Sequence, residues 1–249
     1  MTLDKLTPPD VAIDAAIDAR DLGLRYGNHA ALDQVSLRVP VGAVVGLVGR
    51  NGAGKSSLLR CLVGLTVPSQ GSSTVLGSPS LALSDAVRSR LGYVSQGGDL
   101  LGWLTVWQQI ETLGSFYSNW DAAQARALCE RLALPTGAKV SALSGGDQQK
   151  LAIVLALAHD PDVLILDEPV ASLDPLTRRD FMRLLFEGDV KRKQPRTVLL
   201  SSHLLTDLER VVSHLIFLRE GRIQLQGAWD ELQERHAQPL DELFAQLNA

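Results

Sequence analysis

The sequence predicts an α/β fold built on a mainly parallel sheet, because buried-strand patterns alternate with helical periodicity along the chain. Two short apolar runs, Val44–Val48 and Val163–Leu166, have the composition of strands that are buried on both faces. A third run at Thr197–Leu200 has the same character. Helical patterns separate these runs, as parallel neighbours require. We therefore expect helices on both faces of the sheet.

The first part of the chain has a different pattern. Residues 1–16 lack firm periodicity and are expected to form a loose extension, so that the fold begins near Ile17. Alternating apolar residues then predict two half-buried strands, Ala19–Leu24 and Val35–Val39, joined through the turn at Tyr26-Gly27-Asn28. This pair indicates a small β subdomain ahead of the core sheet.

Helical spacing dominates three further stretches. Residues 84–139 contain few strand-like runs and predict a helical subdomain, placed at about 84–145. Helices are also expected at Leu151–Ala158 and Leu176–Leu185. The last apolar residues repeat as an amphipathic helix over about 239–248, which is expected to dock on the same domain.

Composition excludes several classes of protein. With 249 residues, 45% of them hydrophobic, the chain can form a full core. Its net charge of -4 argues against a general nucleic-acid-binding protein, which carries a basic surface. No apolar stretch approaches the roughly 20 residues of a membrane span. Cys61 and Cys129 lie in neither a metal nor a redox spacing, so they are expected to be reduced core residues of a cytosolic protein.

A phosphate-binding loop is predicted at Gly49–Ser56, between a buried strand and a helix. Its glycines let successive N–H groups reach phosphate oxygens, and the helix N-terminus adds a partial positive charge. Lys55 is expected to contact the β- and γ-phosphates of ATP, and the Ser56 hydroxyl to bind Mg²⁺. The predicted nucleotide contacts are Gly49, Asn51, Gly52, Ala53, Gly54, Lys55, Ser56 and Ser57. The alternative is a glycine-rich turn with an unrelated lysine.

Two carboxylates follow the strand Val163–Leu166 directly. Asp167 is expected at the carboxyl edge of the parallel sheet, where ligands of open α/β sheets bind, and it suits the shell of a Mg²⁺ ion. Glu168, one residue further, is placed to polarise an attacking water. By itself, an Asp-Glu pair is more often a strand-ending turn.

A second small-residue turn precedes the helix at Leu151–Ala158. Ser144, Gly145 and Gly146 offer a hydroxyl and backbone N–H groups at a helix N-terminus, which predicts another anion site. The alternative is an ordinary helix start with Ser144 as the capping residue. A second phosphate-binding turn makes sense if it serves the nucleotide of another subunit.

Together these motifs resemble the nucleotide-binding domain of ATP-binding cassette (ABC) ATPases over residues 17–249, a P-loop NTPase fold with an antiparallel β subdomain and a helical signature subdomain. Gly49–Ser56 matches the family's Walker A motif, Asp167-Glu168 the Walker B motif with its catalytic glutamate, and Leu143-Ser144-Gly145-Gly146 the signature motif. Four more positions match the adenine-stacking aromatic, the Q-loop glutamine, the D-loop and the switch histidine: Tyr26, Gln96, Ser172-Leu173-Asp174 and His203.

The resemblance implies a role for each of these positions. Tyr26 would stack on the base, and Gln96 would sense Mg²⁺ and the attacking water. His203 would contact the γ-phosphate, and Asp174 would cross a dimer interface. The signature residues would contact the γ-phosphate that the opposite subunit binds. Ordinary interpretations remain for the single residues: a turn aromatic, a surface amide, and a capping or core histidine.

One position departs from the pattern of the family. The signature usually ends in glutamine, whereas this chain has Asp147. A carboxylate cannot donate the hydrogen bond that an amide donates, and it would lie near a polyanion. Hydrolysis is expected to survive, because Ser144 and the glycines remain.

The resemblance predicts an ATPase subunit that works as a head-to-tail homodimer with ATP and Mg²⁺ at its interface. Its partners would be separate integral membrane permease chains of the exporter type (ABC-2-like), which would hold it at the inner face of the cell membrane. The segment after Gln96, with Leu100, Leu101, Trp103 and Leu104, is the expected docking region, although these residues could also be core.

Two other functions remain open from the sequence. One is a non-transport ABC ATPase acting on nucleic acid or the ribosome, which the short interval between Gln96 and Ser144 and the single set of motifs disfavour. The other is a regulatory subunit that only binds ATP, which Glu168 and His203 disfavour.

Overall fold

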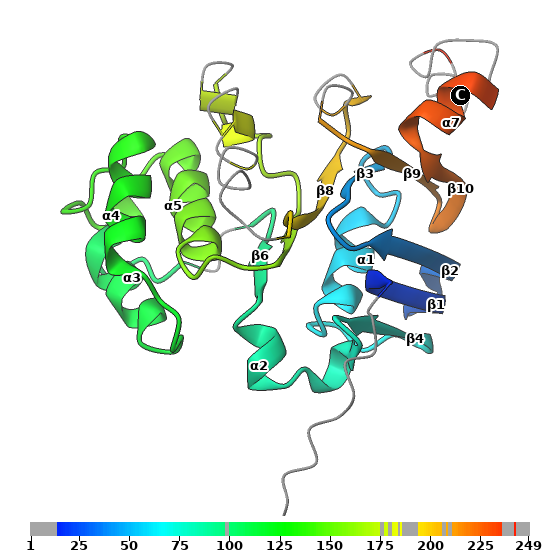
Figure 1. The fold of residues 1–249 in the computed structure, drawn as a ribbon, viewed down its shortest axis with the longest axis horizontal. Coiled ribbons are helices and arrows are strands. Elements are labelled where there is room, and N and C mark those ends of the chain that lie inside the picture. Colours follow the sequence, from blue (N-terminus) through cyan, green and yellow to red (C-terminus); the bar gives the residue numbers. More distant parts are fainter. Residues whose placement is uncertain are drawn as a thin grey trace, which may run out of the picture.

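The computed structural model describes residues 14–97, 100–174, 177–178, 181–183, 185, 194–205, 208, 211–235 and 242. Two sheets form its framework (Figure 1). The antiparallel sheet has the order β2-β1-β4-β5 and comprises β1 (Ala15–Tyr26), β2 (His29–Pro40), β4 (Gln70–Val75) and β5 (Ser78–Pro79). The core sheet has the order β10-β9-β3-β8-β7-β6 and comprises β3 (Val44–Val48), β6 (Leu91–Val94), β7 (Val163–Leu166), β8 (Thr197–Ser202), β9 (His214–Arg219) and β10 (Arg222–Ala228).

The core sheet is parallel from β9 to β6, and only β10 runs antiparallel to its neighbour. The mainly parallel α/β fold predicted from the sequence is therefore confirmed. Side chains alternate between its two faces: Leu47 and Ile165 pack toward the antiparallel sheet, whereas Val48 and Leu166 pack toward the helices. All four are buried, as their uninterrupted apolar runs predict.

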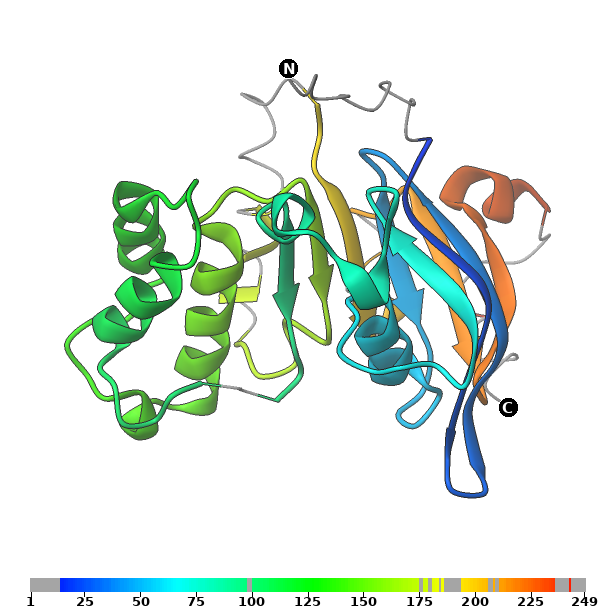
Figure 2. The same ribbon diagram turned by 90° about the horizontal axis from the view of Figure 1, so that it is seen from below.

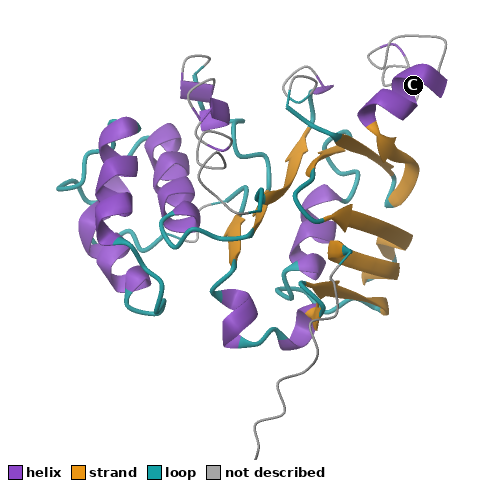
Figure 3. Ribbon diagram, viewed as in Figure 1, coloured by secondary structure: helices purple, strands orange, loops and turns teal. Residues whose placement is uncertain are grey.

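Helices cover both faces of this sheet. The described helices are α1 (Lys55–Leu62), α2 (Asp85–Arg88), α3 (Val106–Gly114), α4 (Ala122–Arg131), α5 (Gly145–Leu157) and α7 (Trp229–Arg235), with 3₁₀ turns at Ser80–Ala82 and Val140–Ala142. Helix α1 lies between the core strands and the antiparallel sheet, while α3, α4 and α5 gather at the opposite end of the molecule (Figures 1 and 2). Figure 3 shows the same division, with α3, α4 and α5 on one side and most strands, together with α1 and α7, on the other.

The boundaries of two predicted segments were wrong. Strand β1 begins at Ala15, so the ordered fold starts before Ile17 and the predicted extension over residues 1–16 is too long. The predicted helical subdomain at 84–145 contains β6, an edge strand of the core sheet. Glycine hides this strand in the sequence. A Cβ at Gly92 would lie 2.6 Å from the carbonyl oxygen of Ala156, so the close packing of α5 on β6 requires glycine there.

Other expectations can be checked only in part. Residues 177–178, 181–183 and 185, which fall within the predicted helix at Leu176–Leu185, are helical. The predicted C-terminal helix over 239–248 lies outside the described residues, apart from residue 242. Cys61 and Cys129 are unpaired and buried, as predicted, and burial raises the pKa of each thiol to about 11. None of the helices within the described ranges has the length and apolar character needed to cross a bilayer.

Candidate active site

The phosphate loop lies between β3 and α1, and backbone from two other strands holds it in place. Gly54 has φ 104°, a left-handed conformation, and a Cβ there would lie 2.5 Å from the carbonyl oxygen of Ala31 in β2. A Cβ at Gly49 would lie 2.3 Å from the carbonyl oxygen of Leu218 in β9. Only glycine allows this approach, so these two glycines fix the path of the loop.

Lys55 is buried at the start of α1, and its ammonium lies at the centre of the loop. Nζ donates hydrogen bonds to the carbonyl oxygens of Gly49 (2.7 Å) and Arg50 (3.3 Å). It also lies 3.1 Å from Oε1 of Glu168, which makes an ion pair between two buried side chains. A phosphate at the loop would compete with these partners for the same ammonium.

The loop forms one side of a cavity of about 310 Å³. The cavity brings together predicted residues from five parts of the chain, the end of β1, the loop, the start of α1, the segment after β6 and the segment after β7. The predicted residues that line it are Tyr26, Asn51, Gly52, Gly54, Lys55, Ser56, Ser57, Gln96 and Glu168. Tyr26 is 51% exposed, so its ring is available to stack on a ligand.

Two predicted loop residues do not line this cavity. Gly49 lies against Leu218, and Ala53 is buried and borders a separate hollow formed with residues 218–220 of β9 and its following turn. Their contribution is to the shape of the loop. His29 and Ala31 line the cavity but were not predicted. The structure pairs His29 with Tyr26 across the β1–β2 hairpin, and the place of His29 just after the predicted turn was the available signal in the sequence.

The carboxylates after β7 are held by Ser201 of the neighbouring strand β8. The Ser201 hydroxyl donates to Oδ1 of Asp167 (2.8 Å), and the backbone N–H of Glu168 donates to the same hydroxyl oxygen (2.8 Å). Asp167 is 1% exposed, so this bond orients a carboxylate that has little access to water. Nothing in the sequence pattern pointed to Ser201, because it continues an apolar strand.

Glu168 occupies an unusual backbone conformation at the edge of the cavity. Its φ of 49° lies in the left-handed region, which costs free energy for a residue with a side chain and is concentrated at functional sites. Nδ1 of His203 lies 2.6 Å from its Oε2, opposite the contact with Lys55. The carboxylate of Glu168 is thus oriented by a partner on each oxygen, next to the predicted phosphate position. His203 itself is partly exposed.

Removing the Ser201 hydroxyl is expected to reduce both stability and turnover. Ser201→Ala leaves the buried Asp167 carboxylate without this donor, which should lower the free energy of unfolding by about 1–3 kcal/mol. Turnover should fall with it, because Asp167 and Glu168 lose their common anchor. Urea unfolding and an ATPase assay measure the two effects. Ser213→Ala, which removes a strand-end hydroxyl remote from these carboxylates, is the control; equal losses in both variants would contradict the anchoring role.

The residues predicted for Mg²⁺ have a donor set that suits this ion. The Ser56 hydroxyl, the Gln96 amide oxygen and the Asp167 carboxylate are hard oxygen donors. Ser56 and Gln96 line the same cavity, and Asp167 directly precedes the lining residue Glu168. Within the described residues, no cluster of three or more His, Cys, Asp or Glu side chains suggests a competing all-protein metal site.

The second predicted anion site lies elsewhere on the chain. Ser144 caps α5, and Gly145 and Gly146 form its first turn. None of the three lines the cavity around Lys55. Gly146 instead approaches the turn of Ser172, since a Cβ on it would lie 3.2 Å from the Ser172 carbonyl oxygen. The two predicted anion sites of one chain therefore do not share a cavity.

Comparisons with known proteins agree with this arrangement. The family model described as ABC transporter matches residues 32–171, and a model described as "AAA domain, putative AbiEii toxin, Type IV TA system" matches residues 137–206. The Nod factor export ATP-binding protein I of Paraburkholderia xenovorans is 35% identical over 221 residues, which cover 86% of this chain and 71% of that protein.

Solved structures show the same likeness. The structure of an ATP-binding subunit of an ABC transporter matches with a TM-score of 0.82 and 27% identity, covering 94% of this chain and 100% of the other. A bacterial ABC transporter cassette solved as a dimer matches with a TM-score of 0.75 and 26% identity, covering 85% of this chain and 98% of the other.

Proposed function

This chain belongs to the ABC transporter family, and we propose that it drives an exporter as a head-to-tail homodimer bound to separate membrane permease chains. As an ABC ATPase it binds and hydrolyses ATP. The observation that carries the proposal is the single cavity in which Tyr26, the phosphate loop, Gln96 and Glu168 meet. The word export in the name of the Paraburkholderia xenovorans relative supports the direction of transport.

ATP would enter this cavity with its base at Tyr26 and its phosphates at the loop. The loop N–H groups and the start of α1 would bind the phosphates, as helix N-termini bind anions generally. Lys55 would exchange its carbonyl and carboxylate partners for phosphate oxygens, and so offset charge that develops during transfer. Ser56, Gln96 and Asp167 would hold Mg²⁺, which supplies further charge stabilisation when bound.

Glu168 would act as the base that positions the attacking water. It lies at the cavity, and once Lys55 turns to the phosphates, the contact of His203 Nδ1 with its Oε2 would still orient its carboxylate. His203 would thereby be a positioning residue for Glu168 as well as a contact of the γ-phosphate. The predicted role of Asp174 at a dimer interface belongs to the same proposal.

A second copy would complete the site. The signature residues Ser144, Gly145 and Gly146 lie outside the cavity of their own chain, which suits a role at the nucleotide of another chain. The related cassette that was solved as a dimer supports this state. ATP would then join the subunits, and hydrolysis would separate them. A permease could couple to this two-state change.

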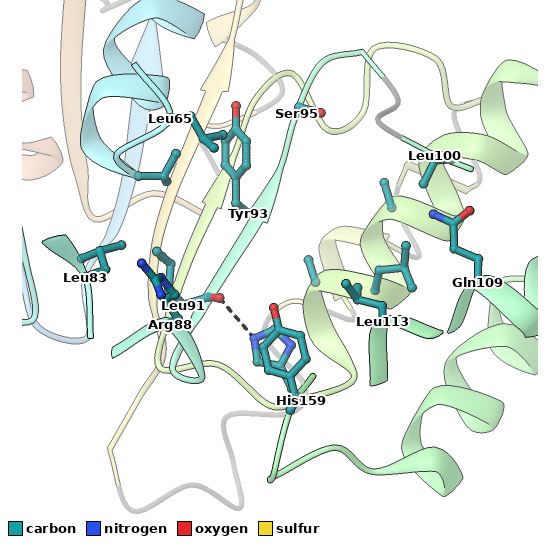
Figure 4. A pocket seen from close by; sticks show the side chains of 15 residues that line it. Leu65, Leu83, Arg88, Leu91, Tyr93, Ser95, Leu100, Gln109, Leu113 and His159 are labelled. Carbon is teal, nitrogen blue, oxygen red and sulfur yellow. Dashed lines mark hydrogen bonds between the residues drawn. The ribbon is translucent and has the colours of Figure 1, made fainter. Parts of the chain in front are cut away.

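A groove between the core sheet and the helical group is the proposed docking site for a helix of the permease. It encloses about 390 Å³ and is mostly apolar. Leu65 and Tyr93 face it from one side, and Leu100, Gln109 and Leu113 from the other (Figure 4). Its lining includes Ser95 and Leu100, which flank Gln96 in the sequence, so a helix seated there would contact a segment that also reaches the nucleotide cavity.

The exposed apolar residues beside this groove support the same partner. Trp103 is 72% exposed and lies in the segment between Gln96 and α3. Leu100, Leu101 and Leu104 are all half-buried, and Leu100 lines the groove, so Trp103 is the exposed member of the predicted docking set. An isolated exposed leucine is ordinary, but an exposed tryptophan beside an apolar groove is typical of an interface.

Trp103→Ala is expected to weaken permease binding without changing ATP affinity. The tagged chain should be purified from native membranes, and the co-purified integral membrane protein identified and quantified. Loss of a large exposed anchor should lower its recovery about tenfold. Val41→Ala, which truncates an exposed apolar side chain in the β2–β3 turn, should leave recovery unchanged. Equal recovery with Trp103→Ala would remove the docking site, and absence of any membrane protein would contradict the transporter function.

A further inference from the structure

Asp147, where the sequence departs from its family, is in contact with Ser144, the serine of the signature turn (Ser144–Asp147). The Ser144 hydroxyl lies 2.8 Å from Oδ2 of Asp147 and accepts the backbone N–H of Asp147 at 3.1 Å. Lys150 donates to the other carboxylate oxygen at 3.1 Å. The three side chains therefore form one network on the first turn of α5.

The direction of the proton in this network follows from the chemistry of its members. Burial opposes the ionisation of Asp147, but hydrogen bonds from Ser144 and Lys150 outweigh it and lower the pKa of the carboxyl below its ordinary value. An ionised carboxylate can only accept hydrogen bonds, so the single hydroxyl proton of Ser144 points to Asp147. A phosphate approaching Ser144 would meet an oxygen lone pair.

The same carboxylate also acts on the helix terminus. A phosphate is attracted to the partial positive charge at the start of a helix, and an acidic side chain in the first turn offsets that charge. Asp147 is such a residue in α5. The ion pair with Lys150 balances the charge of Asp147. It does not free the Ser144 proton from Asp147, and it does not remove the carboxylate from the first turn of the helix. Both effects oppose contact with a polyanion.

We propose that Asp147 is a positioning residue that weakens the ATP-bound dimer, by holding the Ser144 proton away from the γ-phosphate bound to the opposite chain. This inference rests on the proposed function, in which the signature turn completes the partner's site. Glutamine at the same position would be neutral and would release the proton of Ser144. With Asp147 in place, the ATP-bound dimer would therefore dissociate more readily.

The test measures dimer affinity by sedimentation velocity in a Glu168→Gln background, which is expected to retain bound ATP. Asp147→Gln should tighten the ATP-bound dimer about tenfold or more, since a hydrogen bond to a charged group is gained at each site. Asp147→Asn should act in the same direction with less bulk. The dimer in ADP should not tighten, because the γ-phosphate is missing. The inference is supported most strongly if Glu168→Gln alone forms no dimer with ATP and the variant with both Glu168→Gln and Asp147→Gln does.

A double-mutant cycle tests whether the effect passes through Ser144. In a Ser144→Ala background, Asp147→Gln should lose most of its effect on dimer affinity. An equal gain with and without Ser144 would overturn the positioning role, as would an unchanged or weaker dimer in Asp147→Gln. Asp85→Gln is the matched control, because it removes a carboxylate from another i,i+3 pair, with Arg88 in α2. If no variant forms a dimer with ATP, the proposed composite site falls and this inference falls with it.

Discussion

Glu168→Gln is expected to abolish most ATP turnover while retaining ATP binding. The substitution keeps the size of a side chain that is 6% exposed and leaves its backbone hydrogen bond to Ser201 in place. An amide cannot take a proton from water, and loss of general-base catalysis lowers a rate by about 10²- to 10⁴-fold. Because Lys55 loses a competing carboxylate, ATP should bind at least as tightly as before. A steady-state ATPase assay and equilibrium binding of ATP measure the two quantities.

The matched control is Glu130→Gln on the exposed face of α4, which removes the same charge far from the cavity and should leave turnover unchanged. Wild-type turnover in Glu168→Gln would contradict the assignment of the base. Loss of ATP binding in that variant would show instead that Glu168 shapes the loop through Lys55. The two outcomes are distinct, since the first concerns the hydrolysis step and the second concerns the binding of ATP.

Local sequence patterns predicted the parts of the site whose chemistry is set by neighbouring residues. The phosphate loop depends on glycines at fixed spacing and on its place between β3 and α1. Five loop residues and the following Ser57 were therefore predicted from the sequence and line the cavity: Asn51, Gly52, Gly54, Lys55, Ser56 and Ser57. Tyr26 and Gln96 needed the resemblance to a family, because a single aromatic or amide carries no local signal. The structure then brings them to the same cavity.

What the sequence could not predict depends on contacts between distant segments. The Gly49 backbone is fixed by Leu218, and Asp167 by Ser201, and neither partner has a pattern that points to the other. Strand β6 escaped prediction for the same reason. Its glycine looks unfavourable for a strand until α5 is known to pack against it. The periodicity of apolar residues indicates which side chains are buried, but it does not indicate which distant segments contact one another.

The signature turn shows a further limit of prediction from the sequence. The sequence identified Asp147 as a departure from its family but could give no contact for it. The structure supplies the Ser144 and Lys150 hydrogen bonds, and with them a direction for the effect. The effect of Asp147 could be assigned a direction only once its hydrogen bond with Ser144 was known.

Lys55→Met is expected to reduce turnover about 10²- to 10³-fold, since it removes a preorganised donor from the site of developing charge. Methionine keeps much of the aliphatic stem of a side chain that is 6% exposed, so the loop should retain its packing. ATP affinity should fall about tenfold or more, because a hydrogen bond to a charged group is lost. Isothermal titration with ATP and a steady-state ATPase assay measure both effects. Lys139→Met, on the exposed surface of the helical group, should change neither.

The same variant tests the buried ion pair through stability. Lys55→Met removes the cation that lies 3.1 Å from the buried Glu168 carboxylate, and should lower the free energy of unfolding by about 3–5 kcal/mol. Adding Glu168→Gln removes the uncompensated charge, so the double variant should be less destabilised than the sum of the two single variants. Turnover should stay low in the double variant. Additive losses of stability would show that Lys55 and Glu168 do not interact in the folded protein, and would leave the carbonyl oxygens of Gly49 and Arg50 as the groups that hold the ammonium.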